Sequence, residues 1–375
     1  MERSIIEILT KIPDYRKGNA IRHKLEDILT IGLLSTICNG NTFSDMALFG
    51  DTHEKELKEF LELPYGIPSH DTFEDVFAKL EPKSLSVLFE VWVEELKEEL
   101  KNAGIAIDGK TIRRSRGRNK KAIHVVTAFA SEMQLVLGQL ATDEKSNEIT
   151  AIPKLLEMFC VKGKIITIDA MGAQTDIAEK IIGKEGNYIL ALKGNQQNLM
   201  DDVSFYLDNE TVVQSKKKLS EDGLYERTIE KGHGRIETRE CFLCPEIDWI
   251  DGRENWAGLN GIGVIISKRE EIGKETTTAR HYFLYSMENA KAAEILRIKR
   301  SHWAIENSLH WMLDVAFRED DCRARTLNAA ENFNILRKQA LQLMKSETSS
   351  KLSMRQKRLR CAYDFSYALK ILGVI

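Results

Sequence analysis

Two aspartates, Asp108 and Asp169, each stand directly after a short apolar run of the kind that forms a β-strand. A carboxylate at the C-terminal end of a strand lies at the rim of a sheet, where α/β proteins usually build their sites. If the two strands pair in parallel, both carboxylates can reach one hard divalent cation such as Mg²⁺, which prefers oxygen ligands. The alternative is that each aspartate only serves a turn, since Asp-Gly at 108–109 is a common turn dipeptide.

A third acidic residue lies in a polar stripe with a helical repeat. His302, Glu306, His310 and Asp314 recur every four residues and therefore share one helix face, which points either to solvent or into a site. A zinc site that uses both histidines is rejected, because eight helical residues separate them by ~12 Å. Glu306, between the two histidines, is the natural third carboxylate.

The elements that must position these residues follow from the apolar pattern. It predicts helices over residues 1–100, then a strand at 105–107 and a hairpin of residues 123–130 and 134–141. A helix at 149–159, a strand at 164–168, a helix at 175–182 and a strand at 187–192 follow. The order β-β-β-α-β-α-β predicts an α/β fold with a mixed sheet.

The same pattern divides the chain into four parts. We expect residues 1–100 to form a helical domain and residues 101–193 plus 291–345 to form the catalytic domain. Residues 194–290 contain alternating apolar runs with polar connections, which predicts a mostly β insertion. Residues 346–375, which contain the basic run 355–360, are expected to form a basic C-terminal tail.

Length and composition exclude several classes of protein. The 375 residues predict two or three domains, and 43% hydrophobic with 30% charged residues is typical of a folded globular protein. Six Cys are too few for a disulfide scaffold, and the first residues have no apolar leader, so secretion is not expected. The longest apolar stretch is shorter than the ~20 residues that span a bilayer. We expect a cytoplasmic protein.

Positive charge is concentrated locally although the net charge is −3. Residues 1–100 hold 11 Lys and Arg against 20 Asp and Glu, whereas residues 101–130 hold 8 against 1 and residues 321–375 hold 11 against 4. Arg113, Arg114 and Arg116 directly follow Asp108, and Lys193 follows the strand at 187–192. In the functional interpretation these side chains bind DNA phosphates; in the alternative they are solvated surface residues.

Three sequence blocks carry a family resemblance. The blocks IAIDGKTIRRS (105–115), IITIDAMGAQ (165–174) and HWAIENSLHWMLDVAFRED (302–320) resemble the signature blocks of DDE transposases of bacterial insertion sequences, of the H-repeat-associated type. The resemblance implies an RNase H-like catalytic core, a helical associated domain at about 7–95 and a β-rich insertion. It implies that Asp108, Asp169 and Glu306 are the catalytic and metal-binding triad.

The resemblance also implies the chemistry. Two Mg²⁺ ions, with Mn²⁺ as a substitute, would support DNA cleavage and strand transfer at element ends without a covalent protein intermediate. Double-stranded DNA, a homodimer on DNA and a nucleoid-associated location are implied too. Related transposases carry Tyr, Arg and Lys around the Glu, where this chain has Lys299, His302 and Leu313. His302, Arg300 and Lys193 are therefore candidates to hold the phosphate.

Two other functions stay open at the level of sequence. One is an RNase H-like nuclease that hydrolyses DNA without joining it. The other is a catalytically idle protein that has kept only DNA binding. The intact Asp108, Asp169 and Glu306 set favours the transposase over the idle protein.

Overall fold

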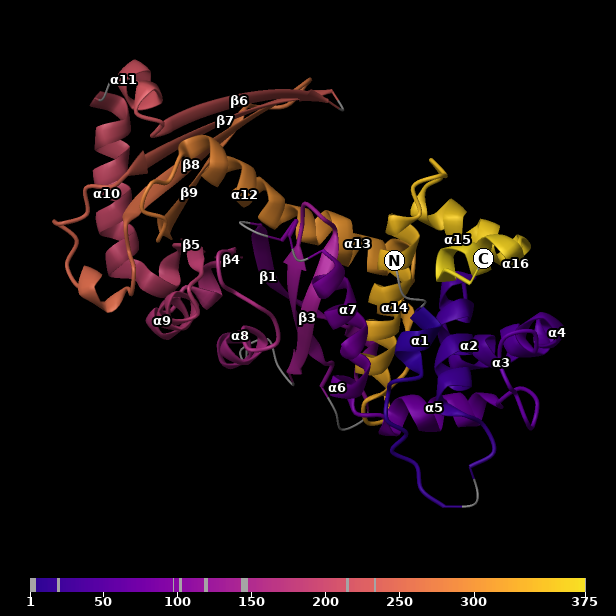
Figure 1. Cartoon of the computed structure of the whole chain (residues 1–375). Coiled ribbons are helices and arrows are strands. Elements are labelled where there is room, and N and C mark those ends of the chain that lie inside the picture. Colours follow the sequence, from indigo (N-terminus) through magenta and orange to yellow (C-terminus); the bar gives the residue numbers. More distant parts are fainter. Residues whose placement is uncertain are drawn as a thin grey trace.

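The N-terminal part of the chain is a set of short helices (Figure 1). The computed structural model describes residues 5–18, 21–96, 98–100, 103–117, 121–142, 148–213, 216–232 and 234–374, with side chains described outside 210–213. Proline and capping residues set several helix starts; for example, the Ser69 hydroxyl accepts a hydrogen bond from the Thr72 N–H at the start of one helix. The helices are α1 (Ile5–Leu9), α2 (Leu25–Ile37), α3 (Phe43–Thr52), α4 (Glu54–Leu57), α5 (His70–Lys79), α6 (Pro82–Leu85) and α7 (Val87–Glu95).

A mixed sheet follows, in the spatial order β3-β2-β1-β4-β5-β9-β8-β7-β6. Its first five strands and two helices follow one another as β-β-β-α-β-α-β, the order that the sequence predicts. Strand β1 pairs in parallel with β4, as β4 does with β5, and every other pair is antiparallel. The first elements are β1 (Gly104–Thr111), β2 (His124–Ala130), β3 (Leu135–Thr142), α8 (Glu148–Leu155), β4 (Ile165–Ile168), α9 (Thr175–Gly183) and β5 (Asn187–Ala191).

One detail of β1 differs from the sequence prediction. Asp108 does not follow the strand but lies inside it, because antiparallel pairing with β2 carries β1 on to Thr111. The parallel pairing of β1 with β4 nevertheless ends at Ile107 and Ile168. Asp108 and Asp169 are therefore each the first residue after the last parallel pair, which places both at one position on the sheet.

The segment predicted as a β insertion begins with helices and then extends the same sheet. Helices α10 (Gln197–Val213) and α11 (Lys216–Glu221) precede four antiparallel strands. The last of these strands returns to pair with β5, with Ile189 opposite Tyr285. The sheet is thus continuous from β3 to β6 (Figure 1). These strands are β6 (Tyr225–Gly232), β7 (Arg235–Cys244), β8 (Gly261–Glu271) and β9 (Thr277–Tyr285).

The two faces of the sheet are covered by different helices. A Cβ on Gly104 would meet Ile298 of α12, so the even-numbered side chains of β1 face α12. Helix α8 covers the other face, where a Cβ on Gly138 of β3 would meet Leu155. The chain from residue 292 on is helical, with α12 (Ala292–Ile305), a π-helical turn (Glu306–His310), α13 (Trp311–Val315), α14 (Ala329–Ser346), α15 (Met354–Tyr363) and α16 (Phe365–Leu372).

The C-terminal residues differ from the predicted tail. Helices α15 and α16 pack against α2 and α14 (Figure 1), and they bury Cys361 of α15 together with Ala368 and Leu372, which lie four residues apart on α16. Within the basic run, Arg358 is buried and its guanidinium donates hydrogen bonds to carbonyl oxygens of Thr36 and Ala316. One cluster of buried apolar residues runs from α1 through the sheet to α16.

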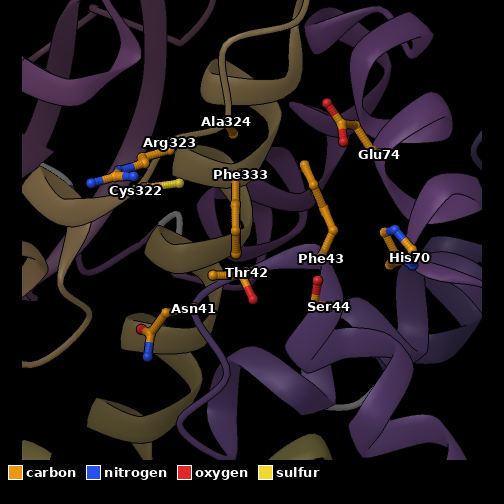
Figure 2. Close-up of a pocket in the computed structure, with 10 residues that line it drawn as sticks. All are labelled: Asn41, Thr42, Phe43, Ser44, His70, Glu74, Cys322, Arg323, Ala324 and Phe333. Carbon is orange, nitrogen blue, oxygen red and sulfur yellow. The ribbon is translucent and has the colours of Figure 1, made fainter.

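The N-terminal helices and α14 also share a surface. A pocket of about 180 Å³ lies where they meet, with His70 and Glu74 on one side and Arg323 on the other (Figure 2). Phe43 of α3 stacks on Phe333 of α14 beside it, with ring centroids 5.5 Å apart. None of the helices in the described ranges has the length and apolar character needed to cross a bilayer.

Candidate functional site

The polar stripe of the C-terminal helices lies along strand β1 rather than in solvent. Asp108 and Lys110 share one face of β1, and His310 and Asp314 lie four residues apart on the facing helix. His310 Nδ1 lies 3.5 Å from Asp108 Oδ2, and Lys110 Nζ donates to Asp314 Oδ1 at 2.7 Å. Two residues of a strand advance roughly 6.6 Å and four residues of a helix advance about 6 Å. Every second side chain of β1 can therefore face every fourth side chain of the helix.

The stripe begins at His302, which the structure places in the interior. His302 Nδ1 and Thr167 Oγ1 of β4 lie 2.8 Å apart. Burial and the charge of Lys299 lower the pKa of His302 to about 3, so its imidazole is neutral at pH 7. This differs from the sequence prediction that His302 contacts DNA, because a buried neutral ring bonded within the protein offers no charge to a phosphate.

The three candidate carboxylates come from three separate elements. Asp108 lies in β1 and is half-buried. Asp169 follows β4, and its Oδ1 accepts a hydrogen bond from the Met171 N–H at 3.1 Å. Glu306 is exposed and opens the π-helical turn between α12 and α13. Such single π turns are rare and occur often at functional sites.

Electrostatics link Asp108 to the other acidic residues. Burial is the largest cause that raises the pKa of Asp108 to about 6; the negative charges of Asp169, Glu148 and Glu306 also raise it, and the hydrogen bond from the Gly109 N–H lowers it. Three acidic side chains therefore act on the charge of Asp108. This charge environment opposes the ionisation of Asp108 in the protein alone.

The donor set suits a hard divalent cation. Within the described ranges, no three His, Cys, Asp or Glu side chains already converge as a metal cage. The carboxylates around Asp108 are nevertheless all oxygen donors, and their mutual repulsion is what a bound cation would relieve. Asp108, Asp169 and Glu306, the residues that the sequence predicts as ligands, could hold such an ion.

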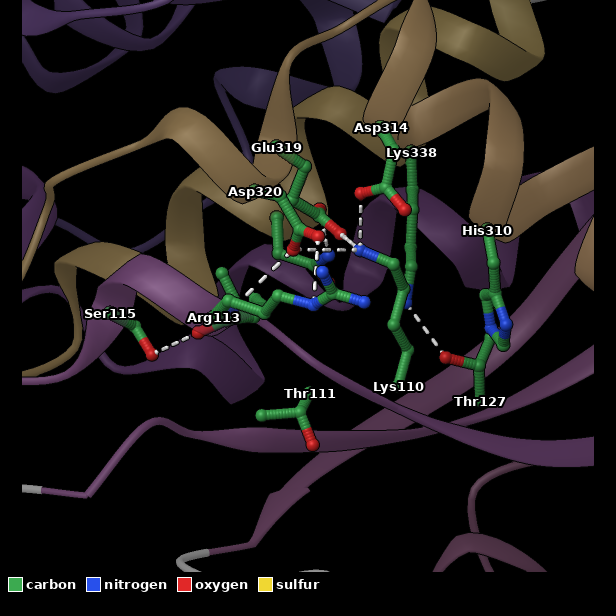
Figure 3. A network of polar contacts seen from close by, with 12 residues as sticks. Lys110, Thr111, Arg113, Ser115, Thr127, His310, Asp314, Glu319, Asp320 and Lys338 are labelled. Atoms are coloured by element: carbon green, nitrogen blue, oxygen red, sulfur yellow. Dashed lines mark hydrogen bonds and ion pairs between the residues drawn. The ribbon is translucent and has the colours of Figure 1, made fainter.

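An ion-pair network fixes β1 to the segment after α13 (Figure 3). Lys110 Nζ lies 2.7 Å from both Asp314 Oδ1 and Glu319 Oε2, and 3.6 Å from Asp320 Oδ1. Glu319 is 0% exposed and also accepts a hydrogen bond from Asn334 Nδ2 at 2.5 Å. The network joins the strand that carries Asp108 to the helical segment that carries Glu306.

The basic side chains that sequence analysis singled out lie around this network. Arg113 is exposed and its Nε lies 3.2 Å from Asp320 Oδ2, while Arg114 Nη1 lies 3.5 Å from Asp321 Oδ1. Arg116 is exposed as well. Residues 118–120 of the same basic segment lie outside the described residues.

Two further basic candidates lie on the other side of the carboxylates. Lys193 is exposed, just after β5, and Arg300 Nη2 lies 2.5 Å from Glu230 Oε1 of β6. A lysine that sequence analysis did not select, Lys299, is 4% exposed on α12. Burial and the charge of Lys193 lower the pKa of Lys299 to about 8, while Asp169 opposes this shift. Lys193 and Lys299 thus place positive charge near Asp169.

Comparison with known proteins decides the family. Residues 99–343 match the family described as "Transposase DDE domain", and residues 6–93 match the family described as "DDE_Tnp_1-associated". The chain belongs to the DDE transposase family. This confirms the resemblance that the three sequence blocks indicated.

One relative that spans nearly the whole chain supports the same membership, and two further proteins are similar to this chain. "H repeat-associated putative transposase YhhI" of Escherichia coli strain K12 is 39% identical over 382 residues, which is 99% of this chain and 98% of that protein. "Inactive transposase YbfQ" of the same strain is 34% identical over 77 residues, 20% of this chain and 92% of that protein. A piggyBac transposase synaptic complex with hairpin DNA gives a TM-score of 0.46 at 13% identity, covering 98% of this chain and 76% of that chain.

One acidic residue of this DDE family member escaped the sequence analysis. Glu148, the first residue of α8, acts on the charge of Asp108, and its Oε1 lies 2.5 Å from His124 Nε2 of β2. The local signal was weak, because an acidic residue at the start of a helix is common. The sequence offers one mark of it, its place directly before the helix predicted at 149–159 after the third strand.

Proposed function

We propose that Asp108, Asp169 and Glu306 form the triad of an RNase H-like core that cleaves DNA and transfers strands at insertion-sequence ends. The observation that carries this proposal is the placement of Asp108 and Asp169 directly after the last pair of the parallel β1–β4 pairing, with Glu306, 198 positions after Asp108, acting on the charge of Asp108 from the π-helical turn. Burial, together with the charges of Asp169, Glu148 and Glu306, raises the pKa of Asp108 to about 6, and such perturbed pKa values are common at functional sites.

The side chains of the protein would bind the cations and keep the site residues in place. Bound at the triad, divalent cations would activate water or a DNA 3′-hydroxyl and stabilise the leaving oxygen. Neutral His302 holds α12 against β4, and the Lys110 network holds α13 against β1, so Asp108 and Glu306 keep their relative placement. In-line displacement at phosphorus then needs no covalent protein nucleophile.

The proposed DNA surface flanks the triad on two sides. Arg113, Arg114 and Arg116 lie on one side, and Lys193 and Arg300 on the other. Each can neutralise a phosphate and position the duplex without reading its sequence. The proposed domain organisation is an associated domain at 1–100, a catalytic domain at 101–193 with 291–345, and an insertion at 194–290. The proposed assembly is a homodimer on DNA, in the cytoplasm.

The test is a cleavage and joining assay with the full-length protein. A labelled duplex from the DNA that flanks the gene is incubated with Mg²⁺ or Mn²⁺, with EDTA as the control. We expect cleavage at a defined end and joined products, and a loss of at least about 10³-fold in rate for Asp108→Asn, Asp169→Asn and Glu306→Gln. Asp176→Asn, an exposed change on α9, is the matched control and should retain activity.

Other outcomes would identify the alternatives. Metal-dependent cleavage without joined products would favour a nuclease. Tight DNA binding without cleavage in either metal would favour a DNA-binding protein that has lost catalysis. Full activity in any one triad variant would remove that residue from the triad.

A further inference from the structure

Glu148 reaches the candidate site from the face of the sheet opposite Glu306. Helix α8, which it opens, covers one face, whereas α12 and the turn with Glu306 cover the other. Glu148 is 6% exposed, and its Oε1 would lie 2.4 Å from a Cβ on Gly109. Since Gly109 directly follows Asp108, the missing side chain opens the space in which the Glu148 carboxylate approaches β1.

His124 holds that carboxylate in place. Its Nε2 lies 2.5 Å from Glu148 Oε1, and its Nδ1 lies 2.9 Å from Thr111 Oγ1, so both ring nitrogens are engaged. The Glu148 side chain is only 8% exposed, and burying a carboxylate costs free energy unless positive charge accompanies it.

Charge balance indicates what the partner is. Asp108, Asp169 and Glu306 together carry three negative charges when ionised, one fewer than two divalent cations need for neutrality. Glu148, which acts on Asp108 directly, supplies the fourth. Oxygen ligands of this kind are the ones that Mg²⁺ and Mn²⁺ take.

We propose that Glu148 is a fourth acidic ligand of the cation site and that His124 is its positioning residue, with Gly109 providing the space between them and Asp108. The proposal rests on the proposed function, because it concerns the same cation site. In this arrangement the acidic ligands come from both faces of the sheet. Asp108 and Asp169 lie where the β1–β4 pairing ends, Glu306 comes from the α12 side, and Glu148 comes from the α8 side.

The test measures metal binding without DNA, so that it does not depend on turnover. Full-length protein is titrated with Mn²⁺ by calorimetry, and its melting temperature is followed at the same Mn²⁺ concentrations. Glu148→Gln keeps the volume and the contact with His124 but removes the charge. We expect Mn²⁺ affinity to fall by at least about tenfold and the Mn²⁺-dependent rise in melting temperature to shrink. Glu157→Gln, an exposed change shortly after α8, should behave like the unmodified protein.

A second variant displaces the carboxylate without changing any charge. In Gly109→Ala the new Cβ would lie 2.2 Å from His124 Nε2 and 2.4 Å from Glu148 Oε1, so one of them must move. We expect a similar loss of Mn²⁺ affinity. Gly183→Ala is the matched control, since a Cβ there meets no atom within 4 Å.

The outcomes separate this proposal from the proposed function. If Asp108→Asn loses Mn²⁺ binding while Glu148→Gln and Gly109→Ala bind as the unmodified protein does, the fourth-ligand proposal is wrong and the triad stands. If the unmodified protein binds no Mn²⁺ and cleaves no DNA, the proposed function fails and the fourth ligand fails with it.

Discussion

The carboxyl group of Asp108 ionises in an unfavourable environment. It is half-buried at the sheet, and three other acidic residues act on it, so its pKa rises from 3.8 to about 6. A raised carboxyl pKa means that the folded protein binds this proton more tightly than the unfolded chain does. The stability associated with the proton is present at pH below about 4 and is lost as the pH rises to about 6.

Asp108→Asn should therefore make the protein more stable at pH 8 in the absence of divalent cations, while abolishing cleavage. A shift from 3.8 to about 6 corresponds to about 3 kcal/mol in the free energy of unfolding, and this is the upper end of the expected gain. At pH 4 the two proteins should differ much less, because Asp108 is then protonated in the folded protein and the pH is close to its unfolded pKa of 3.8. Thermal unfolding at the two pH values checks the prediction; equal melting temperatures at pH 8 would contradict it.

At the scale of elements, the register between β1 and the α12–α13 region decides the site. His302 contacts Thr167 of β4, the strand next to β1. Further along, His310 lies beside Asp108 of β1, and Asp314 forms an ion pair with Lys110 of β1. One face of the helix therefore runs along one face of the strand. Lys110 is the main link, because it is 14% exposed and contacts the fully buried Glu319. Without the Lys110 ammonium group, the buried carboxylate of Glu319 would lose its positively charged partner.

Lys110→Met should destabilise the protein by about 3–5 kcal/mol, since breaking a buried ion pair leaves the other charge uncompensated. Combining it with Glu319→Gln should recover part of this loss, because the remaining group is then neutral. Urea unfolding measures both effects. Lys79→Met, which breaks an exposed ion pair with Asp75, is the control and should change stability by no more than about 0.5–1 kcal/mol. A similar effect of Lys79→Met and Lys110→Met would argue against the network.

At the scale of the whole molecule, the C-terminal helices close the core instead of trailing from it. Arg358 is 1% exposed on α15 and donates to carbonyl oxygens of Thr36, at the end of α2, and of Ala316, directly after α13. Its guanidinium also lies over the Phe317 ring at 4.3 Å. One cation thereby satisfies the C-terminal carbonyls of two helices that are distant in sequence.

Arg358→Met should cost about 2–4 kcal/mol in the free energy of unfolding, because buried carbonyl oxygens lose their donor. Arg355→Met, an exposed change on the same helix, should have little effect. Thermal and urea unfolding of both variants check this. Equal stability of the two would mean that the basic run behaves as the solvated tail that the sequence predicted.

Local sequence determined much of this protein. The strand that ends before Asp169, the four-residue repeat of His302 to Asp314 and the order of elements up to residue 192 depend on spacing along the chain, which can be read directly. Only the tertiary structure decided that His302 is buried and neutral, that β9 pairs with β5 to extend one sheet, and that Glu148 comes to lie against Gly109. These outcomes depend on contacts between residues far apart in sequence, and burial and electrostatic shifts arise only when those contacts form.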